Sequence, residues 1–284
     1  MRVGLVGAGP WAQFVHAPML AAEPQVEFVG IWARRPEAAA ELAAANVTVA
    51  VASTAELFEQ CEAVAFAVPP SVQAELAIEA ARAGCHLLLE KPIGGSVAEA
   101  EALVDAVATA GVVSQVVLTW RYAPVVHDFL ADAAEIEPIG GAGRFLSGAL
   151  LGGPFATPWR LERGALVDLG PHVIDLLDAA IGPVVGVRAA GDLGSWITLQ
   201  LEHESGVIST ATMSATVGND VFRAGAELYS SEGVVEVDCS GAFPAMDTIT
   251  GEFVEAVAQG GHPLDAARGL HLQRIIADAE AQLL

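Results

Sequence analysis

The amino-acid sequence predicts an α/β protein with a doubly wound parallel sheet, followed by an α+β domain with an open, mostly antiparallel sheet. Two observations predict this. Over residues 2–118, short apolar runs typical of buried strands alternate with segments of helical periodicity. Beyond about residue 140, alternating apolar and polar residues are separated by turn signals, which is typical of antiparallel strands. We therefore expect two domains, over residues 1–120 and 121–284.

The chain opens with a strand, a glycine turn and a helix. Residues 2–6 are mostly apolar, and a helical pattern continues to about residue 22. Glycines between a strand and a helix make the tight turn and let a pyrophosphate approach the helix N-terminus. Ala12 takes the third glycine position, a variation that the motif allows. The turn predicts a Rossmann domain whose dinucleotide contacts include Gly7, Ala8, Gly9, Pro10 and Trp11.

The end of the second strand, expected over residues 26–32, favours one cofactor. An acidic residue at this point would bind a ribose 2′-hydroxyl, but here Ala33 is followed by Arg34 and Arg35. Two cations without a carboxylate favour a 2′-phosphate, so we expect NADP, with NAD possible. The alternative is that Arg35 is merely a solvated residue before the helix that Pro36 opens.

Further strands and helices alternate up to residue 118. Two helices begin at capping boxes, Ser53 with Glu56 and Ser96 with Glu99, and the second ends at Gly111. Other helices are expected over residues 36–45 and 71–83, and strands over 47–51, 63–68, 86–89 and 112–118. Ligands of such sheets bind at the carboxyl ends of the strands. These ends place Pro69, Glu90 and Lys91 among the cofactor contacts.

Lys91 is the only lysine among 13 basic residues; the others are arginines. An ammonium is a compact charge whose pKa shifts more readily than that of a guanidinium. This bias suggests that Lys91 has a chemical role that arginine does not fill. Chance survival of one lysine is the alternative.

In the second half, Asp168, His172 and Asp175 stand at i, i+4 and i+7, which is one stripe of a helix. Pro171 is tolerated only in a first turn, so we expect this helix to begin close to Asp168. An imidazole one turn from a carboxylate is a proton-transfer group with a partner that orients it. The alternative is a solvated helix face.

The composition excludes several classes of protein. A formal net charge of −22 disfavours nucleic acid as a partner, and no apolar run is long enough to span a membrane. Cys61, Cys85 and Cys239 have no metal-ligand spacing, so we expect buried thiols in a reducing, cytoplasmic compartment, and no metal site.

With its Gly-x-Gly turn, Glu90-Lys91-Pro92 and Asp168-x-Gly-x-His172-x-x-Asp175, the chain resembles the Gfo/Idh/MocA family, which includes glucose–fructose oxidoreductase and inositol dehydrogenase. The resemblance implies that Lys91 polarises the reacting oxygen, that His172 is the general acid/base, and that Asp168 binds substrate. It also implies a sugar, cyclitol or related polyol as substrate.

Two positions depart from the pattern that this resemblance implies. Gln73 stands where relatives commonly have histidine, and only Gly164 remains of a glycine run, after Glu162 and Arg163. These departures leave open a catalytically silent dinucleotide-binding regulator. They also leave open a reductase of the same fold with a non-carbohydrate substrate.

The second half supplies two further candidates for substrate binding, Arg160 and Arg121, each with a structural salt bridge as the alternative.

A helix is expected over residues 123–134, a loop over 138–143, and final helices over 248–259 and 265–284. Strands are expected over residues 144–151, 184–190, 195–202, 206–215, 225–230 and 233–238. The resemblance implies a homodimer or homotetramer formed through this sheet. His16, His86, His127, His203, His262 and His271 are interpreted as structural or solvated.

Overall fold

A computed structural model describes residues 1–242 and 246–284. The chain divides into two compact units, and each is made of two segments. The first unit comprises Met1–Val117 and Met246–His271, and the second comprises Leu118–Ala245 and Leu272–Leu284. The expected boundary at residue 120 lies close to Val117, where the chain first passes from one unit to the other. Residues 246–271, however, were expected in the second domain and pack with the first unit.

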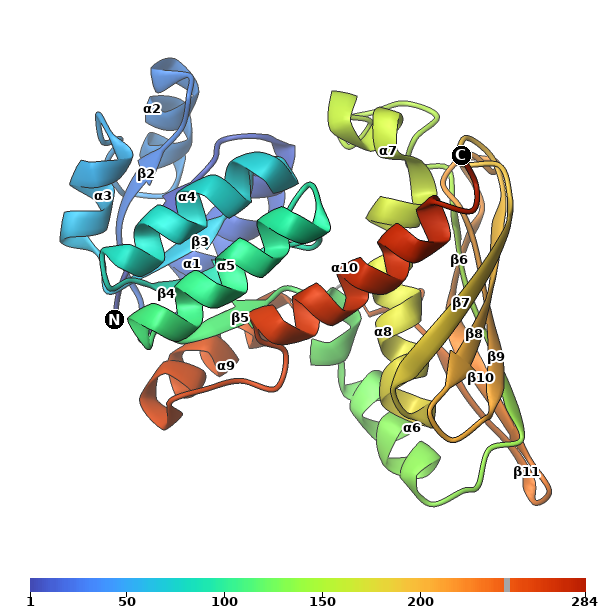
Figure 1. Ribbon diagram of the computed structural model, residues 1–284. Helices are drawn as coiled ribbons and strands as arrows, with labels where there is room; N and C mark the ends of the chain where they lie inside the picture. The colour runs from blue at the N-terminus through green and yellow to red at the C-terminus, as the bar shows by residue number, and fades with distance from the viewer. Residues whose placement is uncertain (243–245) are drawn as a thin grey trace. The chain divides into compact units, whose positions relative to one another are not determined.

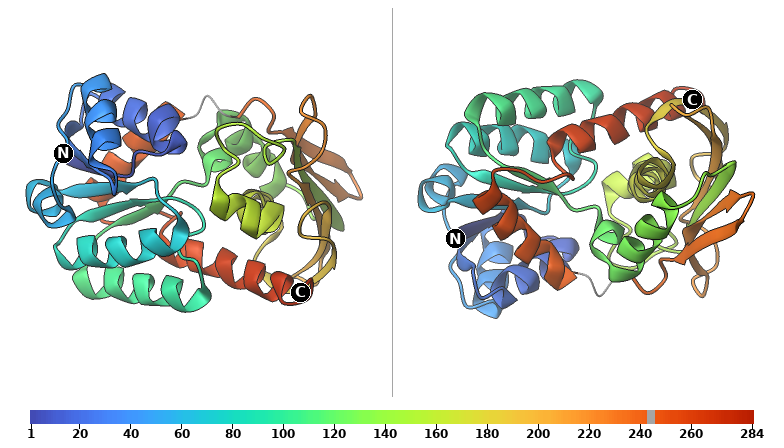
Figure 2. Two further views of the ribbon diagram at one scale, coloured as in Figure 1. Left: turned by 90° about the horizontal axis from the view of Figure 1, so that it is seen from above. Right: turned by 90° about the horizontal axis from the view of Figure 1, so that it is seen from below.

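The first unit contains a five-stranded parallel sheet in the order β2-β1-β3-β4-β5. The strands are β1 (Arg2–Val6), β2 (Glu27–Trp32), β3 (Ala63–Phe66), β4 (His86–Leu89) and β5 (Ser114–Val116). Helices cover both faces, as Figure 2 shows for α4 and α5 on one side and α1 and α9 on the other. Strands covered on both sides are almost entirely apolar, which explains why this half of the sequence predicted a parallel sheet.

The prediction of a strand over residues 47–51 is wrong. This segment forms only an isolated bridge, between Ala50 and Ile31 of β2. Val47 has a φ of 55° and is 96% exposed, so the chain leaves the preceding helix in a turn. Because β2 is the edge of the sheet, the segment meets a single neighbour and covers only part of it.

The helices of the first unit begin and end largely at the signals found in the sequence. Ser53 accepts a hydrogen bond from the backbone N–H of Glu56, Ser96 accepts one from Glu99, and Gly111 ends α5 at a φ of 67°. The helices are η1 (Ala12–His16), α1 (Ala17–Ala22), α2 (Pro36–Ala45), α3 (Thr54–Gln60), α4 (Pro70–Arg82), α5 (Val97–Ala110) and α9 (Met246–Gln259); α10 (Ala266–Glu280) begins in this unit.

Residues 249–266 pack against β5, the edge strand of the first sheet. The backbone N–H of Val116 donates to the carbonyl of Leu264 over 2.6 Å, and that of Ala266 donates to Ser114 Oγ over 3.0 Å. The Gln115 amide donates to the carbonyl of Ile249 in α9 over 3.0 Å. These contacts explain why residues 246–271 belong to the first unit.

The second unit is a six-stranded sheet in the order β11-β10-β6-β9-β8-β7, parallel only between β6 and β9. Helices of this unit pack on one face of the sheet (Figure 1). The strands are β6 (Gly140–Ser147), β7 (Val184–Gly191), β8 (Ile197–His203), β9 (Ile208–Ser214), β10 (Phe222–Ser230) and β11 (Gly233–Asp238). The helices are η2 (Thr119–Tyr122), α6 (Pro124–Ala134), α7 (Pro158–Asp168) and α8 (Gly170–Ile181).

Strand β6 begins four residues before the position expected from the sequence, inside a glycine-rich segment that was interpreted as a loop. A Cβ on Gly141 would lie 2.9 Å from Ile181 Cδ1, and a Cβ on Gly143 would lie 2.9 Å from Val173 Cγ1. The glycines are therefore strand residues that allow α8 to pack closely against the sheet.

All three cysteines are free thiols; Cys85 and Cys239 are buried, and Cys61 is partly buried. Burial raises the pKa of Cys61 to about 12, that of Cys85 to about 11 and that of Cys239 to about 12. The thiolate, which is the reactive form, is therefore suppressed at neutral pH. Within residues 1–242 and 246–284, no helix is both long and apolar enough to cross a membrane.

Candidate functional site

The glycine turn of the first unit has the backbone that a dinucleotide site requires. Gly7 has a φ of 126°, and a Cβ there would lie 2.3 Å from the carbonyl oxygen of Ala67. A Cβ on Gly9 would meet nothing within 4 Å. Gly7 is thus required by the fold, whereas Gly9 leaves open space beside the start of the first helix. The turn fits a pyrophosphate held at that helix N-terminus.

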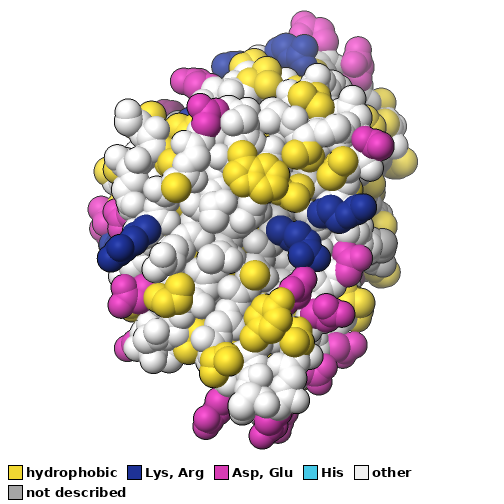
Figure 3. Space-filling model, turned by 90° about the vertical axis from the view of Figure 1, so that its right-hand side faces the viewer, with side chains coloured by type: hydrophobic (Ala, Val, Ile, Leu, Met, Phe, Trp, Pro, Cys, Tyr) yellow, Lys and Arg dark blue, Asp and Glu magenta, His cyan; other side chains and the backbone are white. Residues whose placement is uncertain are grey.

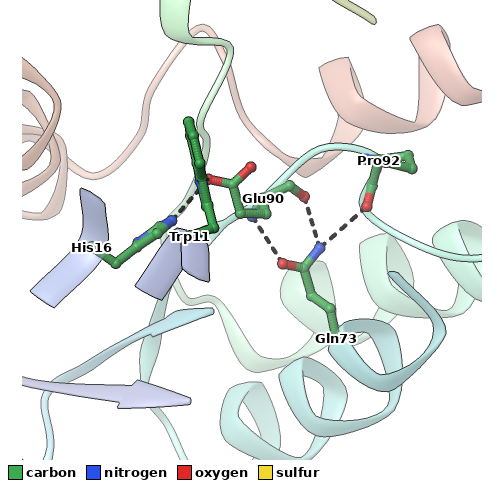
Figure 4. A network of polar contacts seen from close by, with 5 residues as sticks. All are labelled: Trp11, His16, Gln73, Glu90 and Pro92. Atoms are coloured by element: carbon green, nitrogen blue, oxygen red, sulfur yellow. Dashed lines mark hydrogen bonds and ion pairs between the residues drawn. The ribbon is translucent and has the colours of Figure 1, made fainter. Parts of the chain in front are cut away.

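The first helix contains a π-helical turn, η1, closed by a hydrogen bond from the backbone N–H of Ala17 to the carbonyl of Ala12. The wider turn allows Trp11 and His16, five residues apart, to reach one carboxylate oxygen of Glu90 (Figure 4). Trp11 Nε1 donates to Glu90 Oε1 over 2.6 Å, and His16 Nε2 lies 2.8 Å from the same atom.

The side chain of Glu90 is 11% exposed, and its contacts with Trp11 and His16 link the glycine turn to the end of β4. His16 is thus a buried structural residue, which is one of the two roles expected of it, and its partner is Glu90. No local pattern indicated this contact, because His16 and Glu90 are 74 residues apart.

Gln73 holds the backbone beside Lys91. Its Nε2 donates to the carbonyl of Glu90 over 2.7 Å, and its Oε1 accepts the backbone N–H of Glu90 over 2.8 Å. The same Nε2 lies 3.4 Å from the carbonyl oxygens of Pro92 and Ile93. In the sequence Gln73 stands out only as a departure from a family pattern, whereas the structure places it against the turn that carries Lys91.

The two expected phosphate ligands, Arg34 and Arg35, are exposed and follow β2 after Ala33. Neither forms an ion pair within the part of the chain that the structure describes. Pro69 is exposed and directly precedes α4, and Lys91 is partly buried. These residues, like the glycine turn, all belong to the first unit.

In the second unit, the helix that was expected to begin close to Asp168 is α8, which begins at Gly170. Gly164 interrupts α7 at a φ of 68°, where a Cβ would lie 2.4 Å from the carbonyl oxygen of Leu193. Helical geometry resumes at Ala165, and Pro171 lies in the first turn of α8. The remaining glycine is therefore required for a sharp bend directly before the Asp168 segment.

Asp168 is 6% exposed and paired with Arg160, whose Nε lies 3.2 Å from Asp168 Oδ1. The guanidinium of Arg160 lies over two aromatic rings, 5.1 Å from the centre of Trp159 and 5.8 Å from that of Phe155. Aromatic contacts and the ion pair together fix the direction of the guanidinium. Arg160 was expected either to bind substrate or to form a structural salt bridge. The structure shows a salt bridge, and its partner is the candidate substrate-binding carboxylate, Asp168.

His172 is 8% exposed and packs among aromatic rings that the sequence did not single out. The ring centre of Trp120 lies 5.4 Å from that of His172, and the ring centre of Phe145 lies 6.0 Å away. Phe145 in turn packs edge-on against Phe222. Rings from two separate segments therefore pack on this imidazole, and a third segment supports one of them.

Asp175, the third residue of the stripe, is 1% exposed and paired with Arg121, whose Nη1 lies 3.1 and 3.3 Å from its two oxygens. A buried carboxylate requires such a partner. Arg121 therefore forms a salt bridge with Asp175 of α8, as one of its two alternatives expected.

Among the described residues, no group of three or more His, Cys, Asp or Glu could hold a metal ion.

Comparisons with known proteins show the family of the chain. Residues 1–118 match a family model described as "Oxidoreductase family, NAD-binding Rossmann fold". UDP-N-acetylglucosamine 3-dehydrogenase of Acidithiobacillus ferrooxidans is 31% identical over 229 residues, covering 78% of this chain and 70% of that protein. Levoglucosan dehydrogenase of Pseudarthrobacter phenanthrenivorans is 33% identical over 164 residues, covering 54% of this chain and 40% of that protein.

A third relative is similar over its full length. 4-Carboxy-2-hydroxymuconate-6-semialdehyde dehydrogenase of a Sphingobium species is 28% identical, covering 100% of this chain and 99% of that protein. Among solved structures, a levoglucosan dehydrogenase complex with NADH and L-sorbose superposes with a TM-score of 0.89 at 20% identity, covering 100% of this chain and 96% of that one. GenD2 from gentamicin A biosynthesis, in complex with NAD, has a TM-score of 0.88 at 20% identity, covering 100% and 94%.

Proposed function

This chain belongs to the Gfo/Idh/MocA family of NAD-binding oxidoreductases, and we propose that it transfers a hydride between a nicotinamide and a hydroxyl or ketone carbon of a sugar, cyclitol or related polyol. The observation that carries the proposal is the position of its sole lysine. Lys91 lies two residues beyond the end of β4, at the carboxyl end of the sheet that bears the glycine turn. Ligands of doubly wound sheets bind at that edge.

The proposed chemistry divides the work among three residues. Lys91 binds the reacting oxygen, and its ammonium stabilises the negative charge that develops there. His172 takes the proton from the hydroxyl during oxidation and returns it during reduction. Asp168, aligned by Arg160, binds the substrate. The nicotinamide supplies or accepts the hydride.

For the cofactor we propose NADP over NAD, because Arg34 and Arg35 follow β2 where a 2′-phosphate would lie. Gly7, Ala8, Gly9, Pro10 and Trp11 form the proposed pyrophosphate site, with Pro69 at the start of the neighbouring helix. Glu90 acts through Trp11, since its carboxylate oxygen accepts the indole N–H. Arg121 acts through Asp175 and not on the substrate.

We further propose a cytoplasmic homodimer or homotetramer. The reduced cysteines fit a reducing compartment. The helices of the second unit pack on one face of its sheet, and Figure 3 looks onto the other. Much of this face is uncharged, a few Lys or Arg side chains lie within it, and acidic side chains lie mainly toward its margin. A second copy of the chain fits such a face, because charged residues are depleted from the centres of interfaces.

Turnover with NADPH and NADH on a panel of polyols tests the hydride proposal. The panel includes levoglucosan, myo-inositol, UDP-N-acetylglucosamine and D-apiose. We expect turnover on at least one, with His172→Ala reducing kcat by roughly 10²- to 10⁴-fold, which is the usual contribution of a general acid/base. Lys91→Met should lose comparable activity, because it keeps the length of the side chain without its charge.

Matched controls separate chemistry from folding. His203 is a buried histidine of the same unit that contacts the carbonyl of Gly182 and Ser209 Oγ, so His203→Ala should affect stability more than kcat. Full activity of both Lys91→Met and His172→Ala would contradict the proposal. Nucleotide binding without turnover of any compound would favour the silent regulator. Turnover only of a carboxylated semialdehyde would favour a non-carbohydrate substrate, consistent with the relative that matches the whole chain.

A further inference from the structure

The peptide groups of Glu90 lie just beyond the hydrogen-bond ladder of the first sheet. Strand β4 ends at Leu89, whose carbonyl accepts the N–H of Val117 over 2.8 Å. Glu90 is 8% exposed, so its own N–H and carbonyl require partners that the neighbouring strands do not supply.

Gln73 supplies both partners from the first turn of α4. This helix follows β3, the neighbour of β4 in the sheet. The side-chain amide donates to the carbonyl and accepts from the N–H of the same residue, over 2.7 and 2.8 Å (Figure 4). It pairs with Glu90 as a further strand would, and Gln73 itself is 0% exposed.

The orientation of this amide is determined by its surroundings. Nε2 lies near three carbonyl oxygens, those of Glu90, Pro92 and Ile93. A rotated amide would place its oxygen against all three and its NH₂ group against the N–H of Glu90. Only one orientation therefore satisfies the contacts.

We propose that Gln73 is a positioning residue for Lys91. The carbonyl of Glu90 belongs to the peptide bond that joins Glu90 to Lys91, so the amide of Gln73 fixes the plane from which the lysine side chain departs. Its contacts to Pro92 and Ile93 hold the chain on the other side of the lysine. The side chain of Glu90, held by Trp11 and His16, anchors the same turn to the first helix.

The inference rests on the proposed role of Lys91, but its test does not require a substrate. Because Lys91 is the only lysine, protein made with ¹³C,¹⁵N-lysine gives NMR signals from this one residue. We expect one defined set of side-chain signals in the wild type. In Gln73→Met, which keeps the length but removes both hydrogen bonds, these signals should broaden or shift toward those of free lysine.

Two variants serve as controls. Gln115 is also a fully buried glutamine of the first unit, and its amide donates to the carbonyl of Ile249, so Gln115→Met should lower stability but leave the Lys91 signals in place. Gln73→His should retain the wild-type signals at pH 8, because a neutral imidazole offers one donor and one acceptor. If Gln73→Met does not fold, Gln73→Asn replaces it, since its amide is one methylene too short to reach both groups.

A kinetic measurement completes the test with any polyol that is turned over. For Gln73→Met we expect a loss of roughly tenfold to hundredfold in kcat, the scale of an ångström-sized misplacement, with less than about threefold change in the Kd of NADPH. In a Lys91→Met background the second substitution should cost nothing further, because Gln73 acts through Lys91.

Unchanged Lys91 signals in a folded Gln73→Met or Gln73→Asn variant would overturn the inference. Equal disturbance of these signals by Gln115→Met would do the same, since it would indicate a general loss of structure. Failure of the proposed function has a different signature. In that case Lys91→Met would keep full activity, whereas the NMR result for Gln73 would stand on its own.

Discussion

At the scale of single residues, charges on the surface and buried polar pairs have separate tasks. Arg34 and Arg35 are exposed, whereas Arg160 and Arg121 are each paired with a buried aspartate. An exposed cation is available to a ligand, and a cation paired with a buried carboxylate chiefly orients that carboxylate. Arg34 and Arg35 are therefore suited to the proposed discrimination between nucleotides. Arg160 and Arg121 are suited to orienting Asp168 and Asp175 beside the proposed substrate site.

Arg34→Ala should weaken NADPH binding by about 1 kcal/mol, or about fivefold, because one exposed charge-assisted contact to the 2′-phosphate is lost. The Kd of NADH should stay the same, since NADH lacks that phosphate. Fluorescence titration with each nucleotide measures both values. Arg82→Ala, an exposed arginine at the end of α4, is the control. Tighter binding of NADH than of NADPH by the wild type would refute the assignment.

At the scale of elements, the contact between β6 and α8 determines where the His172 helix lies. Gly143 faces Val173, the residue after His172, with a Cβ position only 2.9 Å from Val173 Cγ1 and 3.1 Å from Leu177 Cδ1. No side chain fits there without moving the helix or its side chains. The glycines of this strand thus set the depth at which α8 packs.

Gly143→Ala should destabilise the protein by about 1–3 kcal/mol, the usual cost of overpacking. It should also reduce turnover, because His172 moves with α8. Urea unfolding and kcat measure the two effects. Gly140→Ala is the control in the same strand, since its Cβ would meet only the carbonyl oxygen of Ile208, at 3.6 Å, an ordinary contact distance. Equal stability of the two variants would contradict this account of the packing.

At the scale of the whole molecule, the net charge and the exposed sheet face both bear on the proposed self-association. The chain carries a net charge of −22, which keeps copies apart unless a neutral face is available. Thr210 lies on that face, with Gln200 of β8 and Ala142 of β6 as its neighbours across the sheet. These small or uncharged side chains form the surface through which we propose that copies pair.

Thr210→Glu should convert the proposed dimer or tetramer into a 29.2 kDa monomer, because it would bury like charges opposite one another at the interface. Light scattering during gel filtration measures the mass. Ser205→Glu, in the exposed turn between β8 and β9, adds the same charge away from the centre of the face and should leave the mass unchanged. A wild-type protein that is monomeric at micromolar concentration would rule out this interface.

The sequence by itself determined the features that depend on residues close together in the chain. Apolar periodicity predicted the strands of both sheets, although it also predicted one strand, over residues 47–51, that does not form. The capping serines, Ser53 and Ser96, and the glycine at 111 marked helix ends. The glycine turn, together with the motifs at residues 90–92 and 168–175, indicated the family. Each of these signals lies within one strand, turn or helix, where backbone geometry and side-chain spacing act locally.

Only the tertiary structure decided which distant residues meet. The contacts of Gln73 and His16 with Glu90, the pairing of Arg121 with Asp175, and the return of residues 246–271 to the first unit join residues 17 to 152 positions apart. Such contacts depend on how buried polar groups find partners once the core has formed. The motif located Lys91, but the fold alone determines what holds it.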